Sequence, residues 1–196
     1  MISRILIFLA LVAAFTECRL EAAELHVDRA KPNLVKFISN AKIETFEGIT
    51  SAIDGYLYWE GDSLTEKSDM YFEVDLNTVD TGIGLRNRHM RENYLETDQY
   101  PFTHFKGKII SSIPVSDTTW NVKAKGSIFI HGVEKPLEVD GTIHRTGDHE
   151  YRIRTQFVVR LPDFNIEIPS LMFLKIDENM DLRLDFYLSE IQNKEG

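Results

Sequence analysis

The protein has 196 residues, of which 43% are hydrophobic and 27% are charged, a size and composition typical of a single soluble globular domain. The formal net charge of −9 argues against nucleic acid as a partner, because a phosphate-binding surface needs clustered lysine and arginine. A single cysteine allows no disulfide framework within the chain. A sizeable hydrophobic core must therefore stabilise the fold.

Residues 1–23 have the layout of a secretory signal peptide. A short basic start, "MISR", precedes the apolar run Ile5–Phe15, and a polar stretch that ends in small residues follows it. The apolar run is too short to span a bilayer. We therefore predict cleavage near Ala22 or Ala23 and a domain at residues 24–196 that is periplasmic or secreted.

The single cysteine, Cys18, lies in this leader and raises an alternative. A lipoprotein is cleaved in front of a cysteine that then carries lipid, and such a site needs a small residue just before the cysteine. Here that residue is Glu17, which disfavours lipid anchoring. We expect a free amino terminus near residue 24 and no stable membrane insertion.

After the leader, hydrophobic and polar residues alternate with a period of two, which predicts strands with one buried face. Short connections, among them "HGVEKP", favour antiparallel neighbours. The outward positions carry Lys, Arg, Asp and Glu, so the outer surface faces water rather than lipid. The pattern predicts an all-β fold, either a closed barrel or a sandwich. The eight predicted strands cover 35–43, 53–59, 70–76, 105–109, 120–130, 137–143, 153–159 and 182–188.

Small residues recur on the inward face of these strands. An eight-stranded barrel is just wide enough to be filled by side chains or to hold one ligand. A strand glycine by itself also marks a bulge or tight coiling, but the set as a whole favours an apolar cavity. The small inward residues are Ala41, Gly55, Gly107, Ala124, Gly126 and Gly141. The predicted lining of the cavity is Phe37, Ala41, Ile43, Leu57, Trp59, Phe72, Val74, Phe105, Trp120, Val122, Ala124, Gly126, Ile128, Phe157 and Phe186.

No motif favours an enzyme. The sequence contains no nucleophile elbow, no Ser-x-x-Lys motif and no catalytic cysteine. The six histidines have no cysteine partner and no helical metal-ligand spacing. We therefore predict no catalytic residue, no metal and no cofactor.

One segment interrupts the strand pattern, and it carries a resemblance. "VDTGIGLRNRHMRENYLETDQYPFTHFKGKI" resembles the signature of the YceI-like, polyisoprenoid-binding family. Two further segments, "KGSIFIHGVEKPLEVDGTI" and "FVVRLPDFNIEIP", resemble its second and third signatures. The resemblance runs from Leu25 to about Leu188 and departs from the family at Asn40 and Ala41, near where many members carry a histidine. The matching residues of the first signature are Asp80, Thr81, Gly82, Arg86, Asn87, His89, Met90, Arg91, Tyr100, Pro101 and Phe105.

The resemblance implies a lipocalin-like, eight-stranded antiparallel barrel that binds a long isoprenoid or similar amphiphilic lipid as its partner. It also implies a short helix or ordered loop around residues 84–96 at one end of the barrel. There Arg86, His89 and Arg91 either contact a polar head group or hold the loop in place. An enzyme acting on a lipid inside the barrel and a filled structural or stress-related barrel are the alternatives. The oligomeric state stays open, with a homodimer among the possibilities.

Overall fold

The computed structural model describes residues 22–40, 45–61, 63–168, 170–171, 174–175 and 177–190. Most of the predicted signal peptide, Cys18 included, lies outside the described residues. Two predicted cavity residues, Ala41 and Ile43, lie outside them as well.

The described chain is built mainly of strands, with short helical turns between some of them. The strands are β1 (Ala22–Val27), β2 (Leu34–Asn40), β3 (Thr45–Thr50), β4 (Ile53–Glu60), β5 (Asp69–Asp75), β6 (Phe102–Ser116), β7 (Thr119–Ile130), β8 (Val133–Gly147), β9 (Glu150–Arg160), β10 (Ser170–Leu171), β11 (Leu174–Lys175) and β12 (Asn179–Glu190). The helical segments are the 3-10 turns η1 (Leu76–Thr78) and η3 (Leu161–Phe164), the helix α1 (Gly84–His89) and the π-helical turn η2 (Met90–Tyr94).

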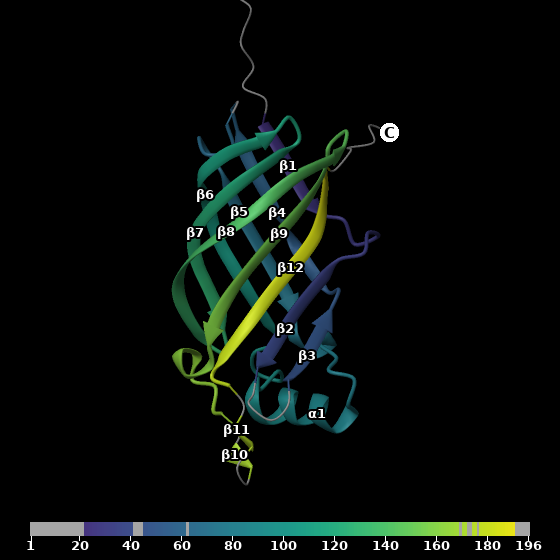
Figure 1. The fold of residues 1–196 in the computed structure, drawn as a ribbon, viewed down its shortest axis with the longest axis vertical. Helices are drawn as coiled ribbons and strands as arrows, with labels where there is room; N and C mark the ends of the chain where they lie inside the picture. Colours follow the sequence, from purple (N-terminus) through teal and green to yellow (C-terminus); the bar gives the residue numbers. More distant parts are fainter. Residues whose placement is uncertain are drawn as a thin grey trace, which may run out of the picture.

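Eight antiparallel strands close into a barrel. They follow one another in the order β1, β4, β5, β6, β7, β8, β9 and β12, and pairing between β1 and β12 completes the ring (Figure 1). Closure leaves the inward face of each strand in a shared interior, which explains the alternating sequence pattern. The predicted barrel is thus confirmed, and so is the short helix, since α1 and η2 lie below one end of the barrel.

The membership of the ring differs from the prediction. The segment predicted as one strand over 35–43 contains β2, which is not a member of the ring, and the separate strand β3 follows at 45–50. Strand β12 pairs with β2 along Met180–Asp185 and with β1 along Leu188–Glu190. The short strand β1, which the pattern did not predict, therefore takes the eighth place in the ring, and β2 and β3 extend the wall at the α1 end.

The connection "HGVEKP" is shorter than predicted. Only His131 and Gly132 form the turn, with φ angles of 49° and 76°, and β8 begins at Val133. Two successive residues with positive φ match the twist of the flanking strands in a two-residue hairpin. The rest of the motif belongs to β8.

Two clusters of buried hydrophobic side chains occupy the interior. The first cluster lies in the half where β1 pairs with β12, and the second lies toward η3. The buried members of the first cluster are Leu25, Val27, Ile53, Leu57, Met70, Val74, Ile109, Ala124, Ile143, Phe186 and Leu188. Those of the second cluster are Ile128, Ile130, Val159, Phe164, Ile166 and Met180.

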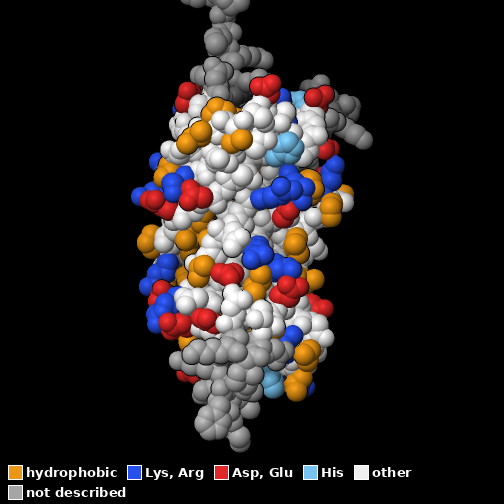
Figure 2. All heavy atoms as spheres, viewed as in Figure 1, with side chains coloured by type: hydrophobic (Ala, Val, Ile, Leu, Met, Phe, Trp, Pro, Cys, Tyr) orange, Lys and Arg blue, Asp and Glu red, His pale blue; other side chains and the backbone are white. Residues whose placement is uncertain are grey.

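The outer surface is charged, as the sequence predicts. Figure 2 shows lysine, arginine, aspartate and glutamate interspersed over the visible face of the barrel. Several of these charges pair across neighbouring strands: Lys125 Nζ lies 2.7 Å from Glu138, and Arg152 Nε lies 2.6 Å from Asp185. Ion pairs on the solvent side of the wall contribute little stability individually, but they keep the wall solvated.

Candidate ligand-binding lumen

The inward glycines have a physical reason other than an open lumen, and the cavity that the small residues favour stays a prediction. A Cβ atom added at Gly126 would overlap the Lys106 carbonyl oxygen and would lie 2.6 Å from the Cα of Gly107. Gly55 has a φ of +133° and would meet the backbone of Tyr71 in the same way. These glycines let neighbouring strands approach and coil tightly, which is the alternative use of glycine in a strand.

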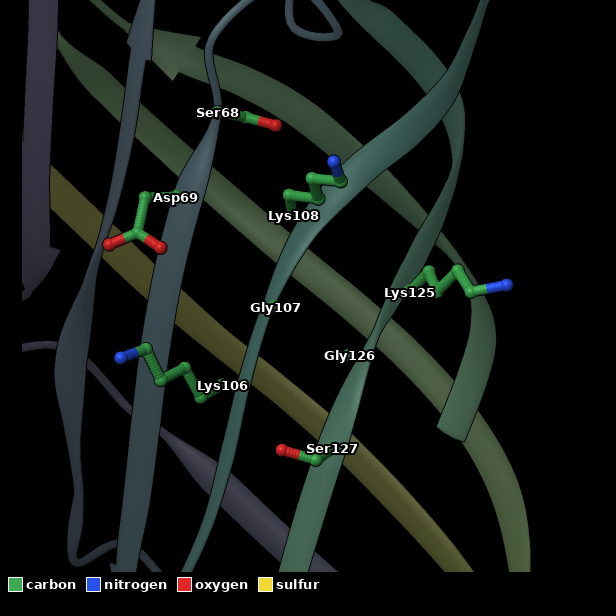
Figure 3. A pocket seen from close by; sticks show the side chains of 8 residues that line it. All are labelled: Ser68, Asp69, Lys106, Gly107, Lys108, Lys125, Gly126 and Ser127. Carbon is green, nitrogen blue, oxygen red and sulfur yellow. The ribbon is translucent and has the colours of Figure 1, made fainter. Parts of the chain in front are cut away.

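Figure 3 shows Gly107 and Gly126 adjacent on β6 and β7. A shallow hollow of about 390 Å³ lies over this pair and is bordered by Lys106, Lys108 and Lys125. These lysines occupy outward positions on their strands, so the hollow belongs to the outer wall. In the close view their side chains point away from one another rather than toward a common centre (Figure 3).

The other predicted lining residues that the structure describes all belong to the two interior clusters. Those that are buried are Leu57, Val74, Ala124, Ile128 and Phe186. Those that keep partial exposure are Phe37, Trp59, Phe72, Phe105, Trp120, Val122 and Phe157. Whether any of them contacts a ligand stays a prediction.

The partly exposed inward residues are most informative in the row that crosses β2, β12 and β9. Leu182 pairs with Phe37 on one side and with Phe157 on the other, and all three are half-buried although they point into a closed barrel. Phe105, which packs against both clusters, is half-buried too. Apolar surface that is not fully covered thus lies along the second cluster and reaches the first at Phe105, and an aliphatic chain is the kind of group that could cover it.

The loop before α1 fixes Arg86 at the α1 end of this space. Arg86 Nε donates to Thr81 Oγ1 at 2.9 Å, and Nη2 donates to the Thr81 carbonyl at 2.6 Å. The guanidinium lies 4.6 Å from the ring centroid of Phe46 on β3, and that ring makes an edge contact with Phe37. Arg86 therefore stabilises the loop and packs on an aromatic pair that reaches the lumen.

Asn87 and Asp80 complete this loop. Asn87 Oδ1 accepts from the Thr81 N–H at 2.8 Å, and Asn87 Nδ2 donates to Asp80 Oδ1 at 2.6 Å. The hydrogen bonds from Asn87 and from the Gly82 N–H hold the pKa of Asp80 below its usual value. Backbone hydrogen bonds of 2.9 Å in both directions join Asp80 to Ile49, so the loop is also attached to the edge of β3.

The structure does not bring the predicted polar trio together. Arg86 faces Thr81 and Phe46, whereas Arg91 Nη1 lies 3.4 Å from the Asn77 carbonyl and His89 is exposed. The contacts of Arg86 and Arg91 are those of loop support, one of the two roles that the sequence left open. A contact between any of the three and a head group stays a prediction.

The three signature segments meet at this end of the barrel. The Tyr100 ring lies against His131, with centroids 4.9 Å apart, and it covers the α-carbon of Gly132. The Phe164 carbonyl accepts a hydrogen bond from His131 Nδ1 at 3.1 Å, and His131 Nε2 lies 2.8 Å from Glu96 Oε2. His131 thus joins η3 to the loop that follows η2, a role that its position in a turn did not indicate.

Ser39 on β2 is the polar residue that the sequence analysis missed. It occupies an inward position next to Phe37, it is 0% exposed, and within the described chain its hydroxyl has no hydrogen-bond partner. A serine between apolar inward positions of one strand was the signal that could have identified it.

Comparison with known proteins places the chain in a family. The sequence pattern of the YceI-like domain matches residues 25–188. The chain belongs to the YceI-like family. A search of curated proteins found no match.

Several solved structures share the fold. BcnA of Burkholderia cenocepacia superposes with a TM-score of 0.68 at 16% identity, covering 82% of this chain and 98% of that one. A polyisoprenoid-binding domain from Saccharophagus degradans, implicated in plant cell wall breakdown, gives 0.67 at 15% identity, covering 87% and 99%. The YceI protein of Campylobacter jejuni gives 0.56 at 14% identity, covering 73% and 83%.

Two features are absent from the described residues of this YceI-like chain. These residues contain no group of three or more His, Cys, Asp or Glu side chains arranged to hold a metal ion. They also contain no helix with the length and apolar character needed to cross a membrane.

Proposed function

We propose that the protein is an exported binding protein that holds one long-chain isoprenoid or similar amphiphilic lipid in its barrel lumen, as a carrier or sequestering protein. The observation that carries this proposal is the half-buried apolar row Phe37, Leu182 and Phe157 inside a closed barrel. Membership of the YceI-like family supports it, because one structural relative is a polyisoprenoid-binding domain.

The chemistry of the lining suits an aliphatic chain. Each methylene that moves from water to an apolar site contributes about 0.8 kcal/mol, so a long chain binds tightly with few polar contacts. Half-buried side chains that pack against the two clusters are apolar or aromatic, and Phe105 links the clusters along the interior. A chain lying against them would replace water on surface that the protein leaves partly uncovered.

Extraction of the purified protein tests the proposal. We expect organic solvent to release about one long-chain amphiphile per chain, identified by mass spectrometry. The stripped protein should then rebind it with a higher melting temperature, because a ligand at a hundred times its Kd stabilises the folded state by about 2.7 kcal/mol. A protein that yields no lipid and shows no shift with any long-chain amphiphile would instead be a filled barrel.

The proposed export has a separate test. Cleavage of residues 1–23 would leave an amino terminus near Glu24. Intact-mass measurement of the protein from the cell envelope should therefore give the mass of the unmodified 24–196 chain. A mass that corresponds to a diacylated Cys18 would show a membrane-anchored lipoprotein instead.

A further inference from the structure

Ser39 carries a buried hydroxyl that no described part of the chain pairs with. Its side chain is 0% exposed, and within the described residues Oγ lies within hydrogen-bond distance of no donor or acceptor. A buried hydroxyl without a partner loses its water without compensation, and such groups are few in folded proteins. The exception requires a physical reason.

The position of Ser39 in the barrel suggests that reason. Ser39 pairs with Met180 on β12 and with Phe46 on β3, and Phe37 occupies the preceding inward position on the same strand. Phe37 belongs to the half-buried row of the lumen and packs against the second cluster, of which Met180 is a buried member. The hydroxyl therefore lies beside the partly uncovered apolar surface, toward the α1 end of the barrel.

We propose that the Ser39 hydroxyl donates a hydrogen bond to an uncharged oxygen, an alcohol or a carbonyl, in the polar head group of the lumen ligand. This inference rests on the proposed function and adds an orientation to it. The head group lies toward α1, beside Ser39, and the aliphatic tail runs past the row Phe37, Leu182 and Phe157 toward the first cluster.

The surroundings of Ser39 select a neutral head group over a charged one. A phosphate or carboxylate at this point would lose its water among Phe37, Phe46 and Met180, and a single neutral hydroxyl does not offset that loss. An alcohol or carbonyl oxygen has a far smaller desolvation penalty and needs only one donor. Ser39 supplies one donor.

The ligand reaches Ser39 by displacing a side chain, because the hydroxyl is fully covered in this structure. Met180, its cross-strand neighbour, is suited to move, since the unbranched thioether side chain has three rotatable bonds and repacks readily. The free protein therefore keeps the hydroxyl closed off, and the bound protein uses it.

The variant Ser39→Ala tests the inference on the stripped full-length mature protein with two probes. The probes are geranylgeraniol and the hydrocarbon that has the same chain but no hydroxyl. We expect the wild type to bind the alcohol more tightly than the hydrocarbon. Ser39→Ala should lower affinity for the alcohol by about 2- to 12-fold, the equivalent of one neutral hydrogen bond, and leave affinity for the hydrocarbon unchanged.

The melting temperature of Ser39→Ala distinguishes a ligand contact from a structural role of the hydroxyl. Removing an unpaired buried hydroxyl should leave the melting temperature of Ser39→Ala equal to or above that of the wild type. Ser127→Ala is the matched control, because this serine lies on the outer face of β7 and its hydroxyl bonds to Glu134. The control should alter neither the affinities nor the preference for the alcohol.

Several outcomes would overturn the inference, and they are distinguishable from failure of the proposed function. If Ser39→Ala keeps the full preference for the alcohol, or weakens both probes alike, Ser39 is not the head-group donor, although lipid binding stands. A melting temperature lowered by several degrees would show that the hydroxyl already has a partner in the free protein. If the wild type binds neither probe and yields no lipid on extraction, the proposed function fails and the inference fails with it.

Discussion

The half of the barrel where β1 meets β12 and the half at the α1 end contain the same kind of inward residues, but they cover them differently. In the first half Leu25, Leu57 and Leu188 are at most 1% exposed. In the other half the buried hydrophobic side chains of the second cluster are 4–9% exposed, and Phe37 and Phe157 are half-buried. The most completely covered hydrophobic side chains therefore lie in the first half, which provides the tightest part of the core that a domain without disulfides needs. Half-buried apolar side chains occur in both halves, Trp59 and Trp120 in the first among them.

Three polar residues at the α1 end differ in whether they have partners within the protein. Ser39, Arg86 and His131 all lie at the α1 end, where three segments distant in sequence come together. Arg86 and His131 have partners within the protein, whereas the hydroxyl of Ser39 has none in the described chain. Arg86 and His131 therefore stabilise the end of the barrel, whereas Ser39 is the residue that we propose for contact with a ligand.

The largest expected effect tests the difference in packing directly. Phe186 is 2% exposed, and its ring makes an edge contact with the ring of Phe72, with the centroids 4.9 Å apart. Phe186→Ala should therefore lower the free energy of unfolding by about 3–5 kcal/mol. Phe157→Ala removes the same atoms from a half-buried position and should lower it by less than half as much. Chemical denaturation measures both, and equal losses would show that the two halves are equally packed.

A smaller loss of unfolding free energy is expected when a side chain is forced between strands β6 and β7 of the barrel wall. Gly126→Leu must push its Cβ into the backbone of β6, so it should destabilise the barrel by about 3 kcal/mol, the upper end of ordinary overpacking. Gly84→Ala is the control, because a Cβ there meets nothing within 4 Å. A stable Gly126→Leu barrel that merely loses lipid would instead favour the glycine-lined cavity predicted from the sequence.

The loop at the α1 end gives the next effect. Arg86→Gln removes two hydrogen bonds to Thr81 and the stacking on Phe46, so we expect a loss of about 1.5–3 kcal/mol in the free energy of unfolding. Arg86→Lys should rescue little, because an ammonium lacks the planar fork of a guanidinium. The exposed His89 provides the control, and His89→Gln should stay within about 0.5 kcal/mol of the wild type. Loss of affinity for an acidic amphiphile in Arg86→Gln without a change in stability would favour head-group contact instead.

The smallest effect is a pH dependence on the outer wall. Burial raises the pKa of Asp185, but the hydrogen bond and charge of Arg152, with a further contribution from Arg154, outweigh burial and hold the pKa below its ordinary value. A depressed carboxyl pKa stabilises the fold above its unfolded value of about 3.9 and loses that contribution as the pH falls through the folded value. Asp185→Asn should therefore be less stable than the wild type at neutral pH and should lose less stability on acidification. Unfolding curves measured over this pH range test the prediction, and Asp98→Asn, at an exposed position, is the control. If the free energy of unfolding of Asp185→Asn falls as steeply with decreasing pH as that of the wild type, the proposed contribution of Asp185 is contradicted.

The sequence predicted the architecture because strand alternation is a local property. Segments such as 120–130 and 153–159 show the inward face without any knowledge of their neighbours. The place of β1 in the ring was missed for two reasons. Its six residues contain only Leu25 and Val27 as an apolar alternation. Its partner β12 is also far away in the sequence, so the pairing leaves no local signal. Local pattern does not encode which distant edge a strand meets.

The site was less predictable for the same physical reason. The role of Arg86 depends on Phe46, a residue on the separate hairpin of β2 and β3, and the role of His131 depends on Phe164 and Glu96. The inward glycines were ambiguous because glycine at an inward position fits both an open lumen and a close approach of strands, and the close approach shows only in the contacts between β6 and β7.

Lipid occupancy of two tryptophan variants tests the central claim most directly. Leu182→Trp adds bulk at the inward position between Phe37 and Phe157, whereas Val158→Trp adds the same group at the neighbouring outward position, which is 52% exposed. Native mass spectrometry of the purified proteins would measure the fraction of chains that carry a lipid. The account predicts that Leu182→Trp loses most of its bound lipid while Val158→Trp keeps the wild-type level. Equal occupancy in both folded variants would contradict a ligand in the lumen.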